Sequence, residues 1–478
     1  MSQTESESGP QEETLDSRAQ RLLHGNLRWA VLLLAAPVIM EMLLNSMVGL
    51  ADTWLSGRVK VNGQLSPAPT SAVGMGVYVN WLAELIFSLV GTGATALVAR
   101  HWGAVEKDKA SRAASCALAL SLVMGVLGVL TVYLAAEKFT EVLGIEQTTR
   151  GLSTRYLRIV CFGHIFTSIL LIGGAALRGA GNTWTPMKIL GLVSGLNIVF
   201  SGALVLGDEY PMLWSLGVDG LAYGTIAARF IGACVMILVL CRGSRSLKTT
   251  LDMRAWTDTE TARRILRIGA PAAADGLLLW GGHFLFLKII ASLDPEGSGS
   301  AVFAAHIVGV QVEAFNYLPA SAFGIAAATL VGQCLGAAKP DRATKGGHEA
   351  AFQASLVACA AGLAFYFGSA EIYGFMHEDP AVSAAGVPAM RLLALFELPL
   401  TITIVYSIAI RGSGDTLPPL VANVLGVYGV RLTVGYWLAV EQGYGLTGAW
   451  AGMGVDVFLR GFGLLIYFHR GRWKKRKV

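Results

Sequence analysis

Three polar residues interrupt an apolar stretch near the start of the chain. Residues 27–57 are long and apolar enough to cross a bilayer, yet they contain Glu41, Asn45 and Asp52. On a helix that turns about 100° per residue, these side chains fall within about 40° of one another and form one polar stripe. A carboxylate in hydrocarbon is costly and usually faces a cavity, a partner or an ion path. The stripe therefore predicts either structural acids satisfied by neighbouring helices or a proton or cation site.

The composition is that of an integral membrane protein. Of 478 residues, 54% are hydrophobic and only 14% are charged, whereas soluble chains have about 25% charged residues. The six cysteines show no C-x-x-C spacing, so neither a zinc site nor a disulfide framework is predicted. Dinucleotide, H-E-x-x-H and Ser/His/Asp patterns are also absent from the sequence. We therefore expect no enzyme activity, no metal, no cofactor and no nucleic-acid partner.

Apolar segments that can span about 30 Å of hydrocarbon recur along the chain. The predicted spans are 28–57, 71–101, 110–135, 153–178, 185–207, 217–241, 265–292, 301–335, 345–372, 385–410, 416–440 and 446–469. They predict an all-α membrane protein of twelve helices in two six-helix bundles. The bundles are an N-lobe (27–242) and a C-lobe (265–469), joined by a polar connector (243–264). Residues 1–26 are expected to be a disordered acidic tail, and 470–478 a basic tail.

The Lys/Arg distribution predicts the orientation. Short loops on one side of the predicted spans, together with the C-terminal end, collect most of the positive charges, while the loops of the other side are mostly acidic or neutral. This asymmetry places both termini in the cytoplasm. The polar N-terminus shows no cleavable signal peptide, so the first span is expected to direct insertion. We expect a multi-pass monomer in the cell (inner) membrane, with the lipid bilayer as its partner.

The two halves of the sequence repeat each other. LVARHWGAVEKDKA (97–110) matches LVGQCLGAAKPDRA (330–343), and RGAGNTWTP (178–186) matches RGSGDTLPP (411–419). Both matches have the same offset (336 − 103 = 233 and 411 − 178 = 233). With six spans in each half, the halves have the same orientation. They are expected to be related by an axis along the membrane normal, as in transporters built from two bundles around a central cavity.

A proline motif is repeated at nearly the same offset. Pro37 and Pro271 lie 234 residues apart (271 − 37), and each has an acid four residues later, Glu41 and Asp275. A proline inside a helix removes a backbone hydrogen bond and favours a kink. Both prolines are therefore predicted to kink their helices.

These motifs resemble those of the multidrug and toxin extrusion (MATE) family. The similar stretches are PVIMEMLLNSMVGLADTWLSG, GATALVARHWGA, ALRGAGNTWTPM, AAATLVGQCLGAAKPDRA and IRGSGDTLPP, and the resemblance covers about residues 28–465. It implies two six-helix lobes around a V-shaped central cavity. It also implies export of amphipathic, usually cationic compounds, driven by proton or sodium entry.

The resemblance assigns a cation-coupling site to the N-lobe. Asp52 occupies the position of the family's first-helix acid. Asn197 and Thr225 match polar residues of the fifth and sixth helices, but Ser201 stands where many relatives have an aspartate. The missing carboxylate disfavours sodium, because a hard cation needs several oxygen ligands and anionic charge. A proton at Asp52 is therefore the preferred prediction, with sodium as the alternative, and Glu41 and Asn45 extend the same stripe.

The C-lobe departs from one branch of the family. Two positions that carry acids in NorM-like members are Leu279 and Leu400 here, so the chain resembles DinF-like members more closely. Other acids of the C-lobe are Asp275, Glu313 and Glu397. They could bind cationic substrate, couple a second ion, or pair with His283, Lys288 or Arg431. Aromatic residues could line the cavity. The candidates are Tyr78, Trp81, Trp280, Phe315 and Tyr406.

The sequence thus predicts a secondary active multidrug efflux transporter. It would exchange small amphipathic cations for H⁺ or Na⁺ by alternating access. The alternative is a flippase for a lipid-linked or polysaccharide precursor, which needs a cationic cavity for anionic head groups. The deep charges here are mainly acidic, which favours cationic cargo. A channel or receptor is a third class, and the duplication argues against it.

Overall fold

The computed structural model describes residues 17–61, 64–65, 68–142, 147–206, 215–243, 247–249, 256–293, 301–377 and 379–476. Within these ranges, eleven helices are long and apolar enough to cross a membrane, and a bent pair of helices makes a twelfth span. This confirms the predicted all-α fold of twelve spans. The strands in these ranges are β1 (Lys60–Val61) and β2 (Gln64–Leu65), each of two residues, which form a hairpin.

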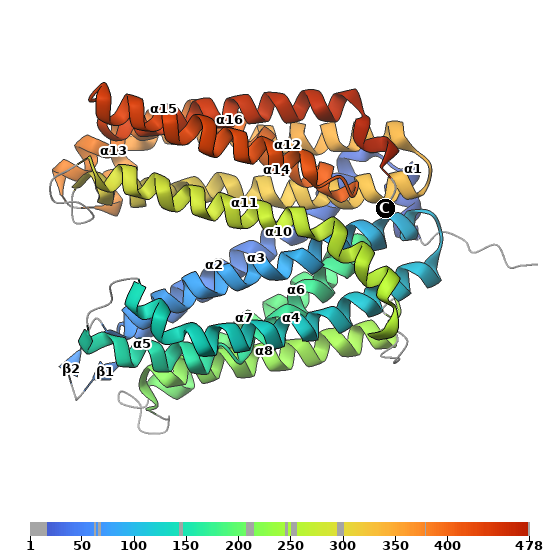
Figure 1. Cartoon of the computed structure of the whole chain (residues 1–478), viewed down its shortest axis with the longest axis horizontal. Helices are drawn as coiled ribbons and strands as arrows, with labels where there is room; N and C mark the ends of the chain where they lie inside the picture. Colours follow the sequence, from blue (N-terminus) through green and yellow to red (C-terminus); the bar gives the residue numbers. More distant parts are fainter. Residues whose placement is uncertain are drawn as a thin grey trace, which may run out of the picture.

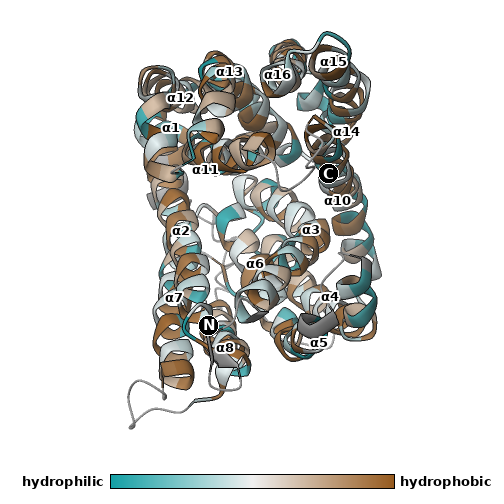
Figure 2. Cartoon of the chain, turned by 90° about the vertical axis from the view of Figure 1, so that its left-hand side faces the viewer, coloured by the Kyte–Doolittle hydropathy of each residue, from teal (hydrophilic) through white to brown (hydrophobic). Residues whose placement is uncertain are grey.

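The helices form the two predicted groups (Figures 1 and 2). The N-lobe contains α2 (Leu27–Ser56), α3 (Ala68–Gly103), α4 (Lys107–Val142), α5 (Gln147–Val160), α6 (Gly163–Gly179), α7 (Trp184–Val205) and α8 (Gly217–Arg242). The C-lobe contains α10 (Thr259–Ala291), α11 (Ala301–Gly336), α12 (Pro340–Met376), α13 (Pro380–Gly412), α14 (Leu417–Asn423), η3 (Val424–Arg431), α15 (Leu432–Tyr436), η4 (Trp437–Glu441) and α16 (Gly445–Arg470). Short helices α1 (Ser17–His24) and η5 (Arg472–Lys475) flank the two lobes.

Two predicted spans are less regular than expected. The span predicted at 153–178 is broken into α5 and α6, which meet at an angle of 50°. The break lies at Cys161 and Phe162, directly before Gly163, and glycine is a poor helix former. The span predicted at 416–440 contains two π-helical segments, η3 and η4. A π-helical turn accommodates an extra residue within a helix.

Residues of both tails pack against the C-lobe. Residues 17–24 form helix α1, so the expectation of a disordered tail is wrong for them, whereas residues 1–16 lie outside the described range. Leu22 and Leu23 of α1 are buried in a core formed with C-lobe helices. Trp473 of η5 is fully buried and stacks on Phe468, with 4.6 Å between ring centroids. Apolar contacts therefore fix both ends of the described chain to the C-lobe.

Helix α10 begins within the predicted connector. It starts at Thr259, because the Asp258 side chain accepts a hydrogen bond from the Thr261 amide (3.0 Å) and caps the helix.

The first helix of each lobe crosses to the other lobe. Ala30, Val31, Leu34 and Ala35 of α2 are buried in the C-lobe core, and α2 also packs against α7 of the N-lobe. Conversely, Ile265 of α10 is buried in the N-lobe core, whereas Ile290 belongs to a C-lobe core. Pro37 and Pro271 lie inside these two continuous helices, close to where the contacts change lobe. In space, α2 and α10 thus contribute to both lobes, although the sequence assigns each helix to one lobe.

The two lobes meet where α3 crosses α11. Gly103 lies against the backbone of Gln333, and a Cβ atom on Gly103 would be only 1.9 Å from the Gln333 carbonyl oxygen. Its repeat partner Gly336 lies against Arg100, with the same 1.9 Å to the Arg100 carbonyl oxygen. The two contacts are equivalent, because Gly336 is the repeat counterpart of Gly103 and Gln333 is the repeat counterpart of Arg100. In Figure 1, the lobes are closest at this end, which also carries α1 and the C-terminus. We call it the closed end.

Candidate cation-coupling and substrate sites

The repeated motifs meet in equivalent ion pairs. In the N-lobe, Arg178 donates to Glu41, with Nη1 at 3.1 Å from Oε1 and 3.3 Å from Oε2. In the C-lobe, Arg411 pairs with Asp275, which is fully buried. Each acid follows its proline by four residues, and each arginine begins an R-G-x-G motif. The duplicated pairs tie α2 to α6 and α10 to α13, so the acids of the proline motif have structural partners in the same lobe.

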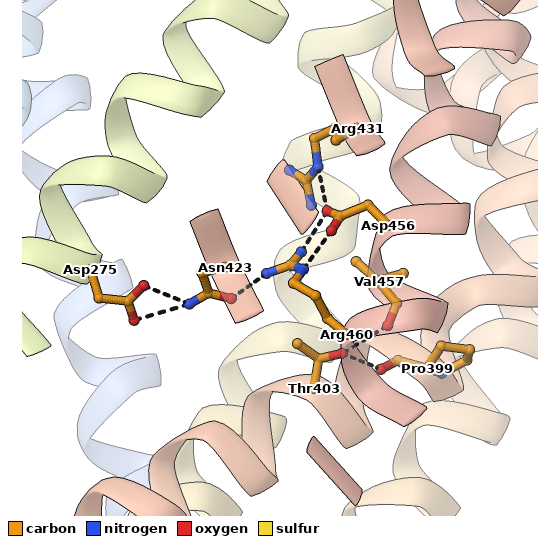
Figure 3. A network of polar contacts seen from close by, with 8 residues as sticks. All are labelled: Asp275, Pro399, Thr403, Asn423, Arg431, Asp456, Val457 and Arg460. Atoms are coloured by element: carbon orange, nitrogen blue, oxygen red, sulfur yellow. Dashed lines mark hydrogen bonds and ion pairs between the residues drawn. The ribbon is translucent and has the colours of Figure 1, made fainter. Parts of the chain in front are cut away.

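Asp275 also begins a buried polar network (Figure 3). Asn423 donates to both oxygens of Asp275, at 2.8 and 2.9 Å, and accepts from Arg460 at 2.6 Å. Arg460 pairs in turn with Asp456, which also accepts from Nε of Arg431 at 2.9 Å. The network joins α10, α14, η3 and α16 in the interior of the C-lobe. This arrangement favours the structural alternative for Asp275 over contact with substrate.

The residues predicted for the N-lobe site lie on α2, α7 and α8. Asn197 and Thr225 are buried, and the Asn197 amide donates to the Thr225 hydroxyl at 2.9 Å. Ser201 is fully buried and packs against Gly224, where a side chain would collide with it. Three of the buried oxygens without a hydrogen-bond partner are Oδ1 of Asp52, Oδ1 of Asn197 and Oγ of Ser201. A buried oxygen without a partner requires an explanation, and a bound proton or cation is one.

An arginine that was not predicted from the sequence lies beside this site. Arg229 is one helical turn after Thr225 in α8. Its Nη1 donates to Asn80 Oδ1 (3.1 Å) and to Thr167 Oγ1 (2.9 Å). Asn80 donates in turn to Glu84 at 2.7 Å. Arg229 belongs to no motif with a characteristic spacing. Its charge within an apolar segment could still have identified it, because a charged side chain in hydrocarbon is energetically costly.

The C-lobe contains a cavity of about 210 Å³. Its polar lining includes Glu313, Arg431, His283, His306 and Tyr317. The remaining lining residues are mainly apolar. They are Phe286, Val310, Leu393, Phe396, Leu400, Ile404, Met453, Gly454 and Val457. Such a pocket, with apolar walls and a few convergent polar groups, is typical of small-molecule sites.

Two further groups of the C-lobe have unpartnered atoms. Nδ1 of His306 accepts from the Trp450 indole at 3.1 Å, and because an indole only donates, a neutral His306 carries its proton on Nε2. This Nε2 has no partner. Glu397 is buried against Asn316 and Thr401, and its Oε1 is also unpartnered. The sequence-predicted acids Glu313 and Glu397 thus lie in one region of the C-lobe, but only Glu313 lines the cavity.

The C-lobe cavity is the repeat counterpart of the N-lobe site. Helices α8 and α16 both begin with G-x-x-G-x-x-x-G, at Gly217 and Gly445, an offset of 228. Gly224 packs on Ser201, and its counterpart Gly452 packs on Gly435. Ser201 and Gly435 are therefore counterparts, with an offset of 234 (435 − 201), one more than the offset of 233 between the R-G-x-G motifs. With these offsets, seven polar residues of the N-lobe region correspond to cavity-lining residues, whereas Ser201 corresponds to Gly435, which does not line the cavity. The pairs are Asp52 and Phe286, Asn80 and Glu313, Glu84 and Tyr317, Thr167 and Leu400, Asn197 and Arg431, Thr225 and Met453, and Arg229 and Val457.

The other predicted residues are spread over the lobes. Asn45 is exposed in α2. Four of the aromatic candidates are at least 37% exposed, as expected for residues available to lipid or ligand. They are Tyr78, Trp81, Trp280 and Phe315. Tyr406 is different, because it is buried in the C-lobe core and its hydroxyl lies 2.7 Å from Nδ1 of His348. The prediction that Tyr406 lines a substrate cavity is therefore wrong.

Comparison with known proteins decides the family. The MatE family model matches residues 37–202 and 271–437, one match in each repeat. The chain belongs to the MatE family. It is 27% identical over 454 residues to the probable multidrug resistance protein NorM of Thermotoga maritima, covering 95% of this chain and 94% of that protein. It is 25% identical to the multidrug resistance protein PmpM of Pseudomonas aeruginosa, covering 94% and 92%.

The fold agrees with solved structures of this family. The chain is similar to an outward-facing conformation of a multidrug resistance MATE family transporter of the MOP superfamily. The TM-score is 0.85 at 20% identity, and the match covers 97% of this chain and 100% of that chain. This MatE protein is thus a multi-pass membrane transporter with the twelve-helix fold. Its predicted closeness to DinF-like members stays a prediction, and the relative in Thermotoga carries the name NorM.

Proposed function

We propose that this MatE protein exports amphipathic cationic compounds by antiport and that Asp52 is the coupling residue. The observation that carries the proposal is the unpartnered, buried Oδ1 of Asp52 on α2, a helix that packs against α7, which carries the unpartnered oxygens of Asn197 and Ser201. Two relatives are named multidrug resistance proteins, which supports small amphipathic compounds as the cargo. Proton coupling is preferred over sodium because Ser201 supplies no negative charge.

The ion pairs distinguish acids with a structural role from the proposed coupling acid. Glu41 and Asp275 are held by repeat-equivalent arginines, which is the pattern expected for a duplicated structural element. Asp52 has no repeat-equivalent acid, since Phe286 occupies its position in the C-lobe. A unique acid with a free oxygen can exchange its cation, whereas a paired acid would first have to lose its arginine. Asp52 is therefore the better candidate for coupling.

Protonation of Asp52 would act on the packing of α2. The neutral side chain no longer attracts a cation, so α2 can change its contacts with α7 and α8. Because α2 begins in the core of the C-lobe and continues in the N-lobe, a change at Asp52 would reach both lobes. The lobes would then rock about the central region in alternating access.

The C-lobe cavity is the proposed site for cargo. Glu313 makes no ion pair or hydrogen bond with any residue in the described ranges, so its carboxylate is free to bind a ligand cation. Phe286, Phe396 and neighbouring aliphatic side chains would hold the apolar part of the ligand. The alternative of a flippase for lipid-linked precursors is not supported by the relatives.

We further propose an inner-membrane location with both termini in the cytoplasm. This orientation follows from the positive residues near α1, α12 and η5, because positively charged loops remain on the cytoplasmic side. The closed end would then be the cytoplasmic end, and the protein would face outward. We propose a monomer, because the proposed coupling residue and the proposed cargo cavity both lie within one chain. Within the family, Leu279 and Leu400 in place of acids support a position closer to DinF-like members.

The test is ethidium efflux from proteoliposomes under an imposed proton or sodium gradient. Wild type, Asp52→Asn, Glu313→Gln and Ser46→Ala would be compared, the last as a control for an exposed polar residue of α2 outside the polar stripe. We expect proton-driven efflux that is lost in Asp52→Asn and retained in Ser46→Ala. We expect Glu313→Gln to weaken cargo affinity. Efflux that is undiminished in Asp52→Asn would contradict the proposed coupling site.

A further inference from the structure

We propose that Arg229 is a built-in cation of the N-lobe site, which excludes Na⁺ from Asp52 and leaves the proton as the cation that exchanges there. This inference rests on the proposed coupling function of Asp52 and specifies how the site selects its ion. It assigns a specificity-determining role to a residue that touches neither Asn197 nor Thr225 through a hydrogen bond.

The guanidinium is fixed beside the site by neutral partners. Its Nη1 donates to Asn80 and Thr167, at 3.1 and 2.9 Å, which connects α8 to α3 and α6. No ion pair joins Arg229 to a carboxylate in the part of the chain that the structure describes. An arginine that is held without a carboxylate partner keeps its charge available to the surrounding groups.

The groups that face Arg229 come from four other helices. Its charge acts on Asp52 of α2, Glu84 of α3 and His164 of α6, and also on Tyr156 of α5. With both acids ionised, the site has two negative charges and one fixed positive charge. In low-dielectric surroundings this fixed charge opposes the entry of another cation.

Without Arg229, the same site would suit sodium. Two carboxylates would remain without a compensating charge, and Asn197 and Ser201 would offer their unpartnered oxygens. An anionic, oxygen-rich set of ligands is what a hard cation requires. A proton needs no such set, because it binds a single carboxylate oxygen. Arg229 therefore discriminates between the two ions by charge rather than by size.

The C-lobe provides a comparison. The repeat counterpart of Arg229 is Val457, yet the C-lobe cavity also contains one arginine, Arg431, which occupies the counterpart position of Asn197. Arg431 lines the cavity together with Glu313, but it is paired with Asp456. Arg229 differs from it in having no carboxylate partner among the described residues.

The test measures sodium binding by the purified full-length protein in detergent at alkaline pH. Binding of radioactive Na⁺ and thermal unfolding in NaCl or choline chloride of equal ionic strength would be compared. We expect no specific Na⁺ effect in wild type or in Arg229→Lys, which keeps the charge. In Arg229→Gln we expect saturable Na⁺ binding that is about tenfold stronger or more, within the usual range of coupling between neighbouring sites. The double variant Arg229→Gln/Asp52→Asn should lose this binding.

Two results would overturn the inference, and neither depends on efflux. One is specific Na⁺ binding by wild type, which can be measured even if Arg229→Gln fails to fold. The other is folded Arg229→Gln that binds no more Na⁺ than wild type. The proposed function fails differently, through efflux that persists in Asp52→Asn. Loss of efflux in Asp52→Asn together with Na⁺ binding by wild type would keep the coupling site and reject the role of Arg229.

Discussion

The glycines at the crossing of α3 and α11 allow a specific perturbation of the closed end. In Gly103→Ala, the new methyl group would lie 1.9 Å from the Gln333 carbonyl oxygen, whereas ordinary van der Waals contact begins at 3.4 Å. The obstacle is backbone, which cannot rotate away as a side chain can. The two helices must therefore separate by about 1.5 Å, the difference between these two distances. Gly336→Ala makes the equivalent demand against Arg100.

The cost of this separation sets the expected shift between conformations. Inserting a methyl group into a well-packed contact costs about 1–3 kcal/mol. Since 1.4 kcal/mol corresponds to a tenfold change in an equilibrium constant, the equilibrium should move by about 5- to 150-fold. It moves away from the state in which the lobes touch at the closed end, because only that state contains the collision. Efflux should slow, because alternating access requires both states.

Hydrogen–deuterium exchange measures this shift without an attached probe. Peptides that cover 95–106 of α3 and 328–338 of α11 should exchange faster in Gly103→Ala and in Gly336→Ala than in wild type. The matched control is Gly195→Ala in α7, where an added Cβ meets no atom within 4 Å. The double variant should be less than additive, because the first methyl group has already separated the helices. Unchanged exchange in both single variants would refute the reasoning.

Two further predictions concern stability. Asp275→Asn should destabilise the protein by about 3–5 kcal/mol, because it breaks the ion pair and the hydrogen bonds of a fully buried carboxylate. Its repeat counterpart Glu41→Gln should cost less, because the Glu41 side chain is 13% exposed. Equal losses on thermal unfolding would contradict this ranking. Trp473→Ala should also lower the unfolding temperature, because it removes a buried ring stacked on Phe468. The control Trp437→Ala, at a half-exposed tryptophan, should have little effect, and an equal loss would show that burial of Trp473 is unimportant.

The repeats made most of the fold predictable. Matched motifs located the duplication, and apolar length gave the twelve spans, because both signals are local in sequence. The break between α5 and α6 was not predicted, since hydropathy continues through Cys161 and Phe162. The π-helical turn η3 was not predicted either. It became visible only when the contact of Gly452 with Gly435 fixed the offset of the repeats beyond it.

The candidate site was predicted in part. The acids Asp52 and Glu313 stand out in sequence because charge in an apolar segment is conspicuous. The partners of Glu41 and Asp275 could not be predicted, because Arg178 and Arg411 lie more than 130 residues away from them along the chain. Tyr406 was misassigned, because an aromatic residue in an apolar helix can equally well face the core, the lipid or a cavity.

The exchange of first helices between the lobes has a consequence for each repeat taken alone. Ala30, Val31, Leu34 and Ala35 of α2 are buried in the C-lobe core, and Ile265 of α10 is buried in the N-lobe core. A chain with a single repeat would expose both of these faces. It could bury them by pairing with a second copy and exchanging first helices, as in a domain-swapped dimer.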